Sequence, residues 1–416
     1  MQNMSSAPSH HRTPPAPADP LDPSALPPAH VPALYIHVPF CAHKCLYCDF
    51  YSLPAQPPQR LQRYVDLLLA EANLHARNSP RPLLRPETVF IGGGTPTLLP
   101  LNSMRNLLRG LRQTFDLSLV NEWTIEANPA TVTPDYCAML ADQRITRLSF
   151  GAQSFRTQDL AFLDRLHNPR DVAESIQIAR AAGFTRLNLD LIYAIPDQDL
   201  AAWTSSLQAA VALDVQHISC YGLTYETGTP LSLRKQQGTI RPATDELELQ
   251  MLHHARRCLA AAGYEPYEIS NYARPGEQCR HNLLYWNGGN YLGLGPAAAS
   301  HLDGLRWRNR PDLTQWEHAI HEGTLPATDV EQLSPPRRAG ELAMLQLRLA
   351  AGVSFSRFAA QTGFDPRSLY SNVLDRLANI GLINLDQQGF RLTDRGIDLA
   401  DAVAAEFLQT APDGPP

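Results

Sequence analysis

The feature that most constrains the fold of this chain is a sixfold alternation of short apolar segments with longer amphipathic ones. Most of the short segments are rich in Val, Ile, Leu and aromatic residues, and each is brief enough to be a buried strand. They read ALYIHV, ETVFIGGG, EWTIEAN, TRLSFG, TRLNLDLIY and QHISCYGL, all between residues 33 and 223. The intervening segments return apolar residues every three or four positions, which is typical of helices that bury one face.

Six βα units in succession predict a parallel sheet with right-handed crossovers. A complete eight-stranded barrel requires two more units, and the alternation stops after Tyr221. We therefore expect an α/β fold, built on a partial (β/α)6 barrel of the TIM type. A small, α-rich domain is expected to follow at the C-terminal end.

Changes in composition divide the chain into five parts. Nine of its 35 prolines precede residue 33, which predicts a disordered, partly polyproline-like segment there. After the barrel, an aromatic and Gly-rich stretch predicts strands and loops packed against it. The expected parts are a Pro-rich tail over 1–32, the partial barrel over 33–225, the barrel-associated region over 226–325, the C-terminal domain over 326–408 and a flexible tail over 409–416.

The C-terminal domain shows two helical patterns followed by a short hairpin pattern, which is the outline of a winged-helix-like unit. Its second helical pattern, residues 365–381, carries two arginines offset by two aspartates, and the whole chain has a net charge of -6. Neither feature favours nucleic-acid binding. We expect this domain to pack against the barrel or to dock a partner protein, and we expect no nucleic acid among the partners.

No segment approaches the ~18 to 20 consecutive apolar residues that a transmembrane helix needs. The N-terminus also lacks the apolar core of a secretory signal. The chain has seven cysteines, of which three are clustered and four are scattered, unlike the even framework of a secreted disulfide-rich protein. These observations predict a soluble protein of the reducing cytoplasm.

The three clustered cysteines are Cys41, Cys45 and Cys48, in a C-x3-C-x2-C spacing directly after the first predicted strand. This position places them at the C-terminal mouth of the barrel, where such folds carry their chemistry. A zinc knuckle is the structural alternative, but zinc normally takes four ligands, and no second Cys or His pair follows His43 at typical spacing. Three thiolates fit a [4Fe-4S] cluster better, because one iron then stays open to an external ligand.

This cysteine spacing after the first strand of a partial barrel resembles the radical S-adenosylmethionine (SAM) superfamily. The resemblance implies that the amino and carboxylate groups of SAM chelate the open iron. It also implies that the cluster delivers one electron, that the sulfonium bond breaks and that a 5′-deoxyadenosyl radical forms.

Further motifs follow the later strands in the same order as in that superfamily. The glycines of GGGTPTLL let the backbone approach a ligand closely, which suits the methionine group of SAM. The resemblance assigns the ribose to Glu126, although any one of these polar groups alone is also compatible with a capping or surface role. The residues expected at SAM or beside it are Tyr35, Tyr47, Gly93, Gly94, Thr95, Glu126, Gln153, Arg165 and Asp190.

The stretches IHVPF, GGGTPTLL, EANP, FGAQSF, LIYAIPDQ and LTYETGTPL resemble the oxygen-independent coproporphyrinogen III oxidase family. Within that family, the oxidases typically continue their motif to a fourth cysteine, CxxxCxxCxC. This chain has Phe50 at that place and reads CDF. The CDF reading resembles the family's other branch, the radical SAM heme chaperones, which are often labelled oxidase-like.

A second stretch, HNLLYW over His281–Trp286, matches the HNxxYW pattern of the chaperone branch. Imidazole can ligate heme iron, and neighbouring aromatic rings offer flat apolar walls to a porphyrin. We therefore predict His281 as a heme ligand, against the alternative of a hydrogen-bonded core histidine. Cys279 is an alternative axial or covalent ligand.

The resemblance implies a heme chaperone that carries a [4Fe-4S] cluster and SAM, holds heme and delivers it to an acceptor protein that the sequence does not name. No coproporphyrinogen oxidase activity is expected and no catalytic residue is assigned. SAM is either cleaved to trigger heme release or only regulates it. The alternatives are a coproporphyrinogen III oxidase of heme biosynthesis and a nucleic-acid-binding regulator with the cluster as sensor.

Overall fold

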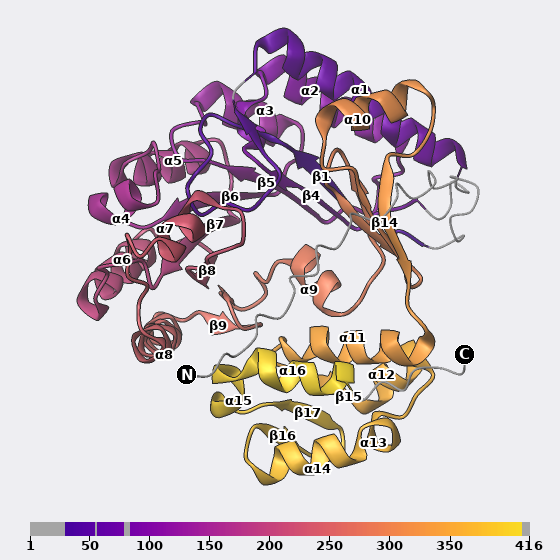
Figure 1. Ribbon diagram of the computed structural model, residues 1–416. Coiled ribbons are helices and arrows are strands. Elements are labelled where there is room, and N and C mark those ends of the chain that lie inside the picture. The colour runs from indigo at the N-terminus through magenta and orange to yellow at the C-terminus, as the bar shows by residue number, and fades with distance from the viewer. Residues whose placement is uncertain (1–29, 55, 79–83, 410–416) are drawn as a thin grey trace, which may run out of the picture.

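The computed structural model describes residues 30–54, 56–78 and 84–409. Six parallel strands lie side by side in chain order, which confirms the predicted partial barrel (Figure 1). Three short strands extend this sheet. β11 (Leu292–Leu294) pairs in parallel with β1, and β10 (Asn271–Ala273) and then β9 (Glu265–Pro266) continue antiparallel beyond β8. The six barrel strands are β1 (Ala33–Val38), β4 (Thr88–Gly93), β5 (Glu122–Ala127), β6 (Arg147–Gln153), β7 (Leu187–Tyr193) and β8 (His217–Gly222).

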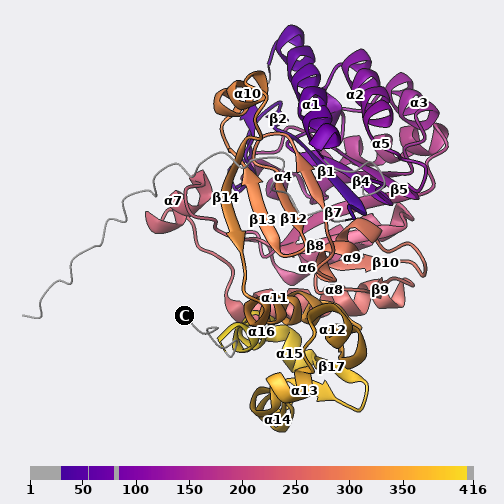
Figure 2. The same ribbon diagram turned by 90° about the vertical axis from the view of Figure 1, so that its right-hand side faces the viewer.

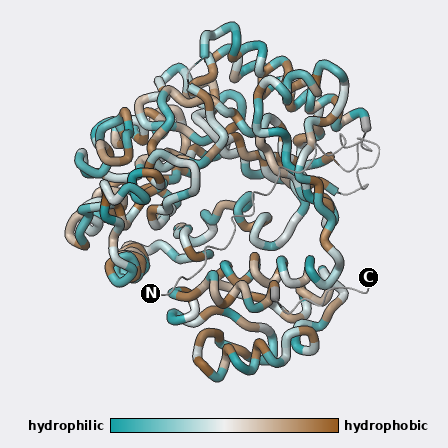
Figure 3. Tube along the Cα trace, viewed as in Figure 1, coloured by the Kyte–Doolittle hydropathy of each residue, from teal (hydrophilic) through white to brown (hydrophobic). Residues whose placement is uncertain are grey.

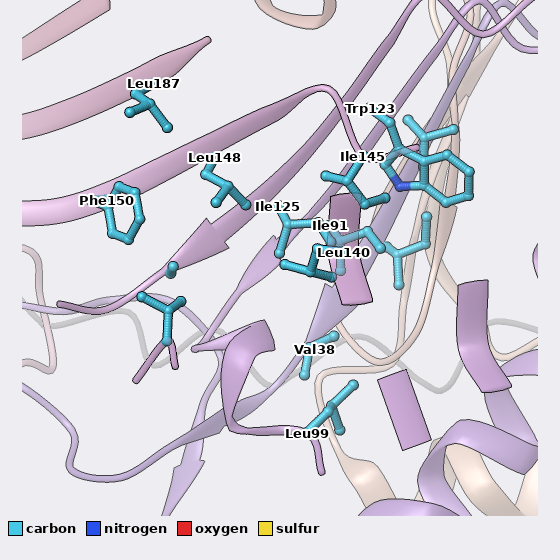
Figure 4. Packing of buried hydrophobic residues seen from close by; sticks show 14 of the residues in the cluster. Val38, Ile91, Leu99, Trp123, Ile125, Leu140, Ile145, Leu148, Phe150 and Leu187 are labelled. Atoms are coloured by element: carbon cyan, nitrogen blue, oxygen red, sulfur yellow. The ribbon is translucent and has the colours of Figure 1, made fainter. Parts of the chain in front are cut away.

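The two faces of the barrel strands differ in chemistry. Successive side chains of a strand point to opposite faces, so alternate residues share a face. Leu148 and Phe150 of β6 are buried in the hydrophobic core beneath the surrounding helices (Figure 4). Ser149 and Arg147, on the same strand, face the barrel interior and line a cavity. The inner face is therefore a polar wall inside an otherwise apolar scaffold.

Amphipathic helices cover the outer face of the sheet, and hydrophilic and hydrophobic residues alternate along them (Figure 3). The sequence predicted the longer helices, but not α3 and α4, which are too short to show a clear 3.6-residue period. Thr133 caps α3 through its side chain, which accepts the backbone N–H of Tyr136. The covering helices are α1 (Pro58–Asn78), α2 (Leu101–Thr114), α3 (Pro134–Asp142), α4 (Thr157–Phe162), α5 (Pro169–Ala181), α6 (Leu200–Ala212) and α8 (Asp245–Ala261).

The region after the barrel carries α7 (Pro230–Gln236), α9 (Arg280–Trp286) and a three-stranded antiparallel sheet (Figure 2). The HNLLYW stretch forms α9, where the sequence predicted strands and loops. Tertiary contact explains the difference, because the Glu122 carboxylate accepts the first backbone N–H groups of this helix. The small sheet consists of β12 (Ala299–Leu302), β13 (Leu305–Asn309) and β14 (Ala327–Gln332), with α10 (Leu313–His321) between the last two.

The C-terminal part has its own hydrophobic cluster, in which the Phe390 and Phe407 rings stack at a centroid distance of 5.3 Å. Its two helical patterns and hairpin occur in the predicted order, and α9 lies between it and the barrel (Figure 1). Its elements are α11 (Pro335–Leu347), β15 (Val353–Ser354), α12 (Phe355–Thr362), α13 (Pro366–Leu369), α14 (Ser371–Asn379), β16 (Ile383–Leu385), β17 (Gly389–Leu392), α15 (Asp394–Asp398) and α16 (Ala400–Gln409).

Most of the two predicted tails lies outside the described residues. Where the description begins, Val31 is buried and the Pro32 carbonyl accepts the backbone N–H groups of Glu87 and Thr88. These two residues are packed on the barrel. Within the described ranges, no helix is both long and apolar enough to cross a membrane.

Candidate functional site

The three clustered cysteines lie on the loop that follows β1, at the C-terminal end of the parallel strands. Cys41 ends the short strand β2 (Phe40–Cys41), which pairs with β3 (Leu53–Pro54) and fixes the start of the loop. The Cys48 backbone N–H donates to the Cys45 carbonyl at 3.2 Å, and this bond closes a turn from Cys45 to Cys48. All three thiols reach the same cavity.

This cavity has a volume of about 750 Å³ and extends from the cysteine loop into the barrel. It collects most of the residues predicted from the sequence, although they come from six separate segments of the chain. Tyr35 and His281 do not line it, and neither does the alternative heme ligand Cys279. Those that do are Cys41, Cys45, Tyr47, Cys48, Gly93, Gly94, Thr95, Glu126, Gln153, Arg165 and Asp190.

The glycines at the end of β4 allow this strand to lie directly against the cysteine loop. A Cβ atom on Gly94 would lie 2.6 Å from the Phe40 carbonyl oxygen, and one on Gly93 would lie 2.6 Å from the His37 ring. Gly93 also has a φ of 104°, a conformation that side chains disfavour. The next residue, Thr95, brings its hydroxyl to 3.9 Å from the Cys41 sulfur. Larger residues here would push the loop away from the strand.

Two of the residues predicted from the sequence place a carboxyl group on the cavity wall. Glu126 accepts the Gly93 backbone N–H at 3.0 Å, and burial together with the Asp190 charge raises its pKa to about 8. Asp190 accepts hydrogen bonds from Asn188 at 2.8 Å and Ser149 at 3.3 Å, and burial raises its pKa as well. The wall therefore offers carboxyl oxygens that can accept hydrogen bonds from the hydroxyl groups of a ligand.

Arg165 connects the cysteine loop to two strand ends. One guanidinium nitrogen donates to the Cys45 sulfur at 3.4 Å, and the other donates to the Asn128 side chain at 2.5 Å and the Gly151 carbonyl at 2.8 Å. The Arg165 Nε is buried without a hydrogen-bond partner among the described residues. A buried donor without a partner beside the cysteines marks a position where a ligand acceptor fits.

Gln153 ends β6 in a left-handed conformation, with a φ of 62°. The pairing of β6 with β7 is also irregular between Gly151 and Gln153. Such a bulge redirects a side chain at the end of a strand, and here the Gln153 side chain lines the cavity. Non-glycine residues keep this conformation mainly at sites where the surroundings impose it.

The two remaining predicted residues are packed elsewhere. The Tyr35 hydroxyl lies 2.9 Å from Nδ1 of His37, on the inner side of β1. His281 is 1% exposed, with Nδ1 at 2.9 Å from the Thr88 hydroxyl and Nε2 at 2.8 Å from the Tyr285 hydroxyl. Burial lowers its pKa to about 3, so the ring is neutral. Both ring nitrogens are engaged in this conformation, and iron ligation by His281 requires that one of these bonds opens.

Several cavity residues were not predicted from the sequence. They are polar residues at alternate positions of the barrel strands, together with one residue of the HNLLYW stretch. Strands that are buried on both faces are normally continuous apolar runs. The polar residues in TRLSFG, TRLNLDLIY and QHISCYGL therefore indicate a polar cavity on one face of these strands. The additional residues are Asn128, Arg147, Ser149, Asn188, His217, Ser219 and Asn282.

The cysteine set fits an iron–sulfur cluster. Among the described residues, no three His, Cys, Asp or Glu side chains converge closely enough to hold one metal ion. Three thiols that share a cavity without converging on one point suit a group with several irons better than a single zinc ion. The unpartnered Arg165 donor and the close glycine backbone beside them suit a ligand at the remaining iron.

Family comparisons agree with the fold and the site. The profile of the Radical SAM superfamily matches residues 35–209, and that of the HemN C-terminal domain matches residues 333–399. The barrel with its cysteine loop is thus a radical SAM protein, a class whose members carry a [4Fe-4S] cluster and SAM. The Escherichia coli coproporphyrinogen III oxidase HemN shares this fold, with a TM-score of 0.79, 22% identity and 92% of each chain covered.

Curated relatives define the family more closely. The heme chaperone HemW of Lactococcus lactis is 31% identical over 374 residues, which cover 90% of this chain and 96% of the relative. HemW of Mycobacterium tuberculosis is 36% identical over 377 residues, with 90% and 94% covered, and HemW of Bacillus subtilis is 35% identical over 380 residues, with 90% and 98% covered. The chain belongs to the heme chaperone HemW family. The prediction of the chaperone branch, made from Phe50 and HNLLYW, is confirmed.

Proposed function

We propose that this chain binds heme and a SAM-ligated [4Fe-4S] cluster, and that it delivers the heme to an acceptor protein in the cytoplasm. The observation that carries the proposal is the cysteine loop, which presents three thiols to the cavity and Phe50 where the oxidases have a fourth cysteine. The Phe50 side chain is 64% exposed at this mouth. Membership of the HemW family supports the heme part of the proposal.

Cys41, Cys45 and Cys48 would hold the cluster, and the cavity wall beside them would hold SAM. When bound, the pair supplies one-electron chemistry at the sulfonium group. Glu126 would accept hydrogen bonds from the ribose, and Arg165 would donate to an acceptor of SAM while it keeps the cysteine loop on the strand ends. Gly93, Gly94, Thr95, Gln153 and Asp190 complete this proposed set, together with Tyr47 on the loop itself and Tyr35 on β1.

The heme ligand stays a prediction. His281 would reach iron through Nε2 only if its contact with the Tyr285 hydroxyl opens. The alternative ligand Cys279 is also buried, and burial raises the pKa of its thiol to about 12. Its sulfur donates to the Glu122 carboxylate at 3.4 Å. Either ligand would have to give up its present hydrogen bond before it could bind iron.

In this proposal the barrel binds the cluster and SAM. The C-terminal part, residues 326–408, contacts a partner protein. The apolar cluster of this part is separate from that of the barrel, so it can present its own surface. Sequence-specific binding in a gel shift would instead support the regulator alternative.

Heme titration of the anaerobically purified protein, with and without cluster and SAM, tests the function. We expect saturable heme binding, and transfer to apomyoglobin as a general acceptor. Replacing SAM by a non-cleavable analogue distinguishes the two possible roles of SAM. Heme release would stop with the analogue if SAM cleavage drives it, and would continue if SAM only regulates it. In parallel, the reduced protein is incubated with SAM and coproporphyrinogen. Formation of protoporphyrinogen would overturn the chaperone proposal in favour of the oxidase.

A further inference from the structure

Arg147 is the first residue of β6 and lies at the closed end of the barrel cavity. Its side chain is 3% exposed and faces the barrel interior, as do Ser149 and Gln153 on the same strand. It lies six positions before Gln153 at the mouth, which corresponds to roughly 20 Å along an extended strand. The cavity therefore has a cationic group far below the cysteine loop.

The guanidinium of Arg147 has no hydrogen bond or ion pair within the parts of the chain that the structure describes. An arginine carries five N–H donors and stays charged, so burial without partners is costly. The Glu122 carboxylate attracts it electrostatically, but its oxygens already accept the backbone N–H groups of Arg280 and His281 and an ion pair from Arg186. The Arg147 donors are thus left facing the cavity.

Several polar groups near Arg147 form hydrogen bonds with one another, while the Glu122 and Asp190 carboxyl groups attract its charge. The His217 ring lies 2.5 Å from the Asn188 side-chain oxygen and 2.9 Å from the Tyr267 hydroxyl. Burial lowers the pKa of His217 well below its usual value. Asn188 in turn donates to Ser149 at 2.7 Å. Among the described residues, no member of this network forms a hydrogen bond with the guanidinium.

Asn282, the second residue of HNLLYW, also lines the cavity, and its amide lies 3.5 Å from the Tyr267 hydroxyl. His281 beside it is anchored by Thr88 and Tyr285. The motif therefore closes the end of the cavity with an amide, while its imidazole holds α9 in place. An amide and an unpartnered guanidinium together recognise a planar anion.

We propose that Arg147 and Asn282 bind a carboxylate of a ligand that enters the barrel interior below the proposed SAM site. A guanidinium forms charge-assisted, often bidentate bonds with a carboxylate, and the buried position strengthens them. The carboxylate belongs either to a porphyrin propionate or to a small organic acid. The porphyrin source rests on the proposed heme function, whereas the carboxylate site itself does not.

The experiment compares heme with heme dimethyl ester, whose esterified propionates carry no charge to pair with a guanidinium, by titration of the full chain in mild detergent. Succinate serves as the small acid and is titrated by calorimetry. The variants are Arg147→Gln and Arg147→Lys, with Arg112→Gln as control, because Arg112 lies over the Trp123 ring on the outer face of the same sheet. Circular dichroism and thermal unfolding confirm that each variant is folded.

We expect wild type and Arg112→Gln to bind heme at least about tenfold more tightly than the ester, the factor that ~1.4 kcal/mol of a charged hydrogen bond supplies. Arg147→Gln should lose this difference, and Arg147→Lys should keep part of it. If both Arg147 variants unfold, the comparison of heme with its ester on the wild-type protein still tests the site.

If succinate binding depends on Arg147 and heme binding does not, the site binds a small acid. Equal affinity of wild type for heme and ester, together with no succinate binding, overturns the site. If the wild-type protein does not bind heme at all, the proposed function is refuted. The carboxylate site is then tested by succinate binding alone.

Discussion

Phe90 and His281 stack with ring centroids 5.2 Å apart, and this contact joins β4 to the HNLLYW helix α9. His281 is thus part of the packing between the barrel and the helix below it. Its removal changes structure as well as any iron ligation, which affects how heme experiments on this residue are designed.

Replacing His281 with Ala should destabilise the protein by about 2–4 kcal/mol, because it leaves a buried void and two hydroxyls without partners. Loss of heme binding in that variant alone would not identify a ligand. Tyr285→Phe is the sharper change, since it frees Nε2 and keeps the ring packing. If His281 ligates iron, Tyr285→Phe should bind heme at least as tightly as wild type, as measured by visible titration. Weaker heme binding in Tyr285→Phe would count against ligation by Nε2.

Cys45→Ser and Cys48→Ser should each abolish a stable iron–sulfur cluster, because three thiolates are the minimum set for this type of site. The measurements are bound iron and sulfide after anaerobic reconstitution, together with visible absorbance. Cys258→Ser is the control, since Cys258 lies near His254 on α8 and is absent from the cavity wall. Retention of full iron content in either cysteine-loop variant would contradict the assignment.

Arg165→Lys should weaken SAM binding about tenfold, because an ammonium cannot keep the three contacts of the guanidinium to the cysteine loop, Asn128 and Gly151. Equilibrium binding of SAM to the reconstituted protein measures the effect. Arg170→Lys, near the start of α5 and away from the cavity wall, should bind SAM as wild type does. Unchanged SAM affinity in Arg165→Lys would remove Arg165 from the proposed SAM site.

Phe50→Cys restores the CxxxCxxCxC pattern of the oxidases but should not confer coproporphyrinogen turnover. The Phe50 side chain is largely exposed, so a thiol there should stay accessible after cluster reconstitution. The measurements are alkylation of the new thiol, by mass spectrometry, and the anaerobic oxidase assay. Protoporphyrinogen formation by this variant would show that one residue separates the two branches functionally.

Stability should fall as the pH is lowered below about 6.5, because several histidines are buried in the neutral form. Burial lowers the pKa of His75 to about 4, and its Nε2 has no partner among the described residues. The unfolded chain then binds a proton between pH 6.5 and 4 that the folded chain does not. His75 alone should therefore cost about 2 kcal/mol at pH 5 relative to pH 8. His75→Leu should reduce this loss, measured by urea unfolding at both pH values, and an unchanged pH dependence would refute the explanation.

The order of the six βα units could be predicted from sequence, because the burial of strands and helices imposes periods of two and 3.6 that are local properties of the chain. The cysteine loop was equally readable, since three thiols within eight residues need no folding to be close. α9 could not be predicted in this way. Its first N–H groups are satisfied by Glu122, which is more than 150 residues earlier in the chain.

The class of fold, the cysteine motif and the branch of the family could therefore be read from the local pattern of residues. The role of the HNLLYW stretch could not, because the partners of His281 and Asn282 come from β4 and from the segment around Tyr267. Folding also places Arg147 against the cavity with no hydrogen bond to any of the described residues. Whether a buried charge has a partner depends on side chains that only the closed arrangement of the strands brings together.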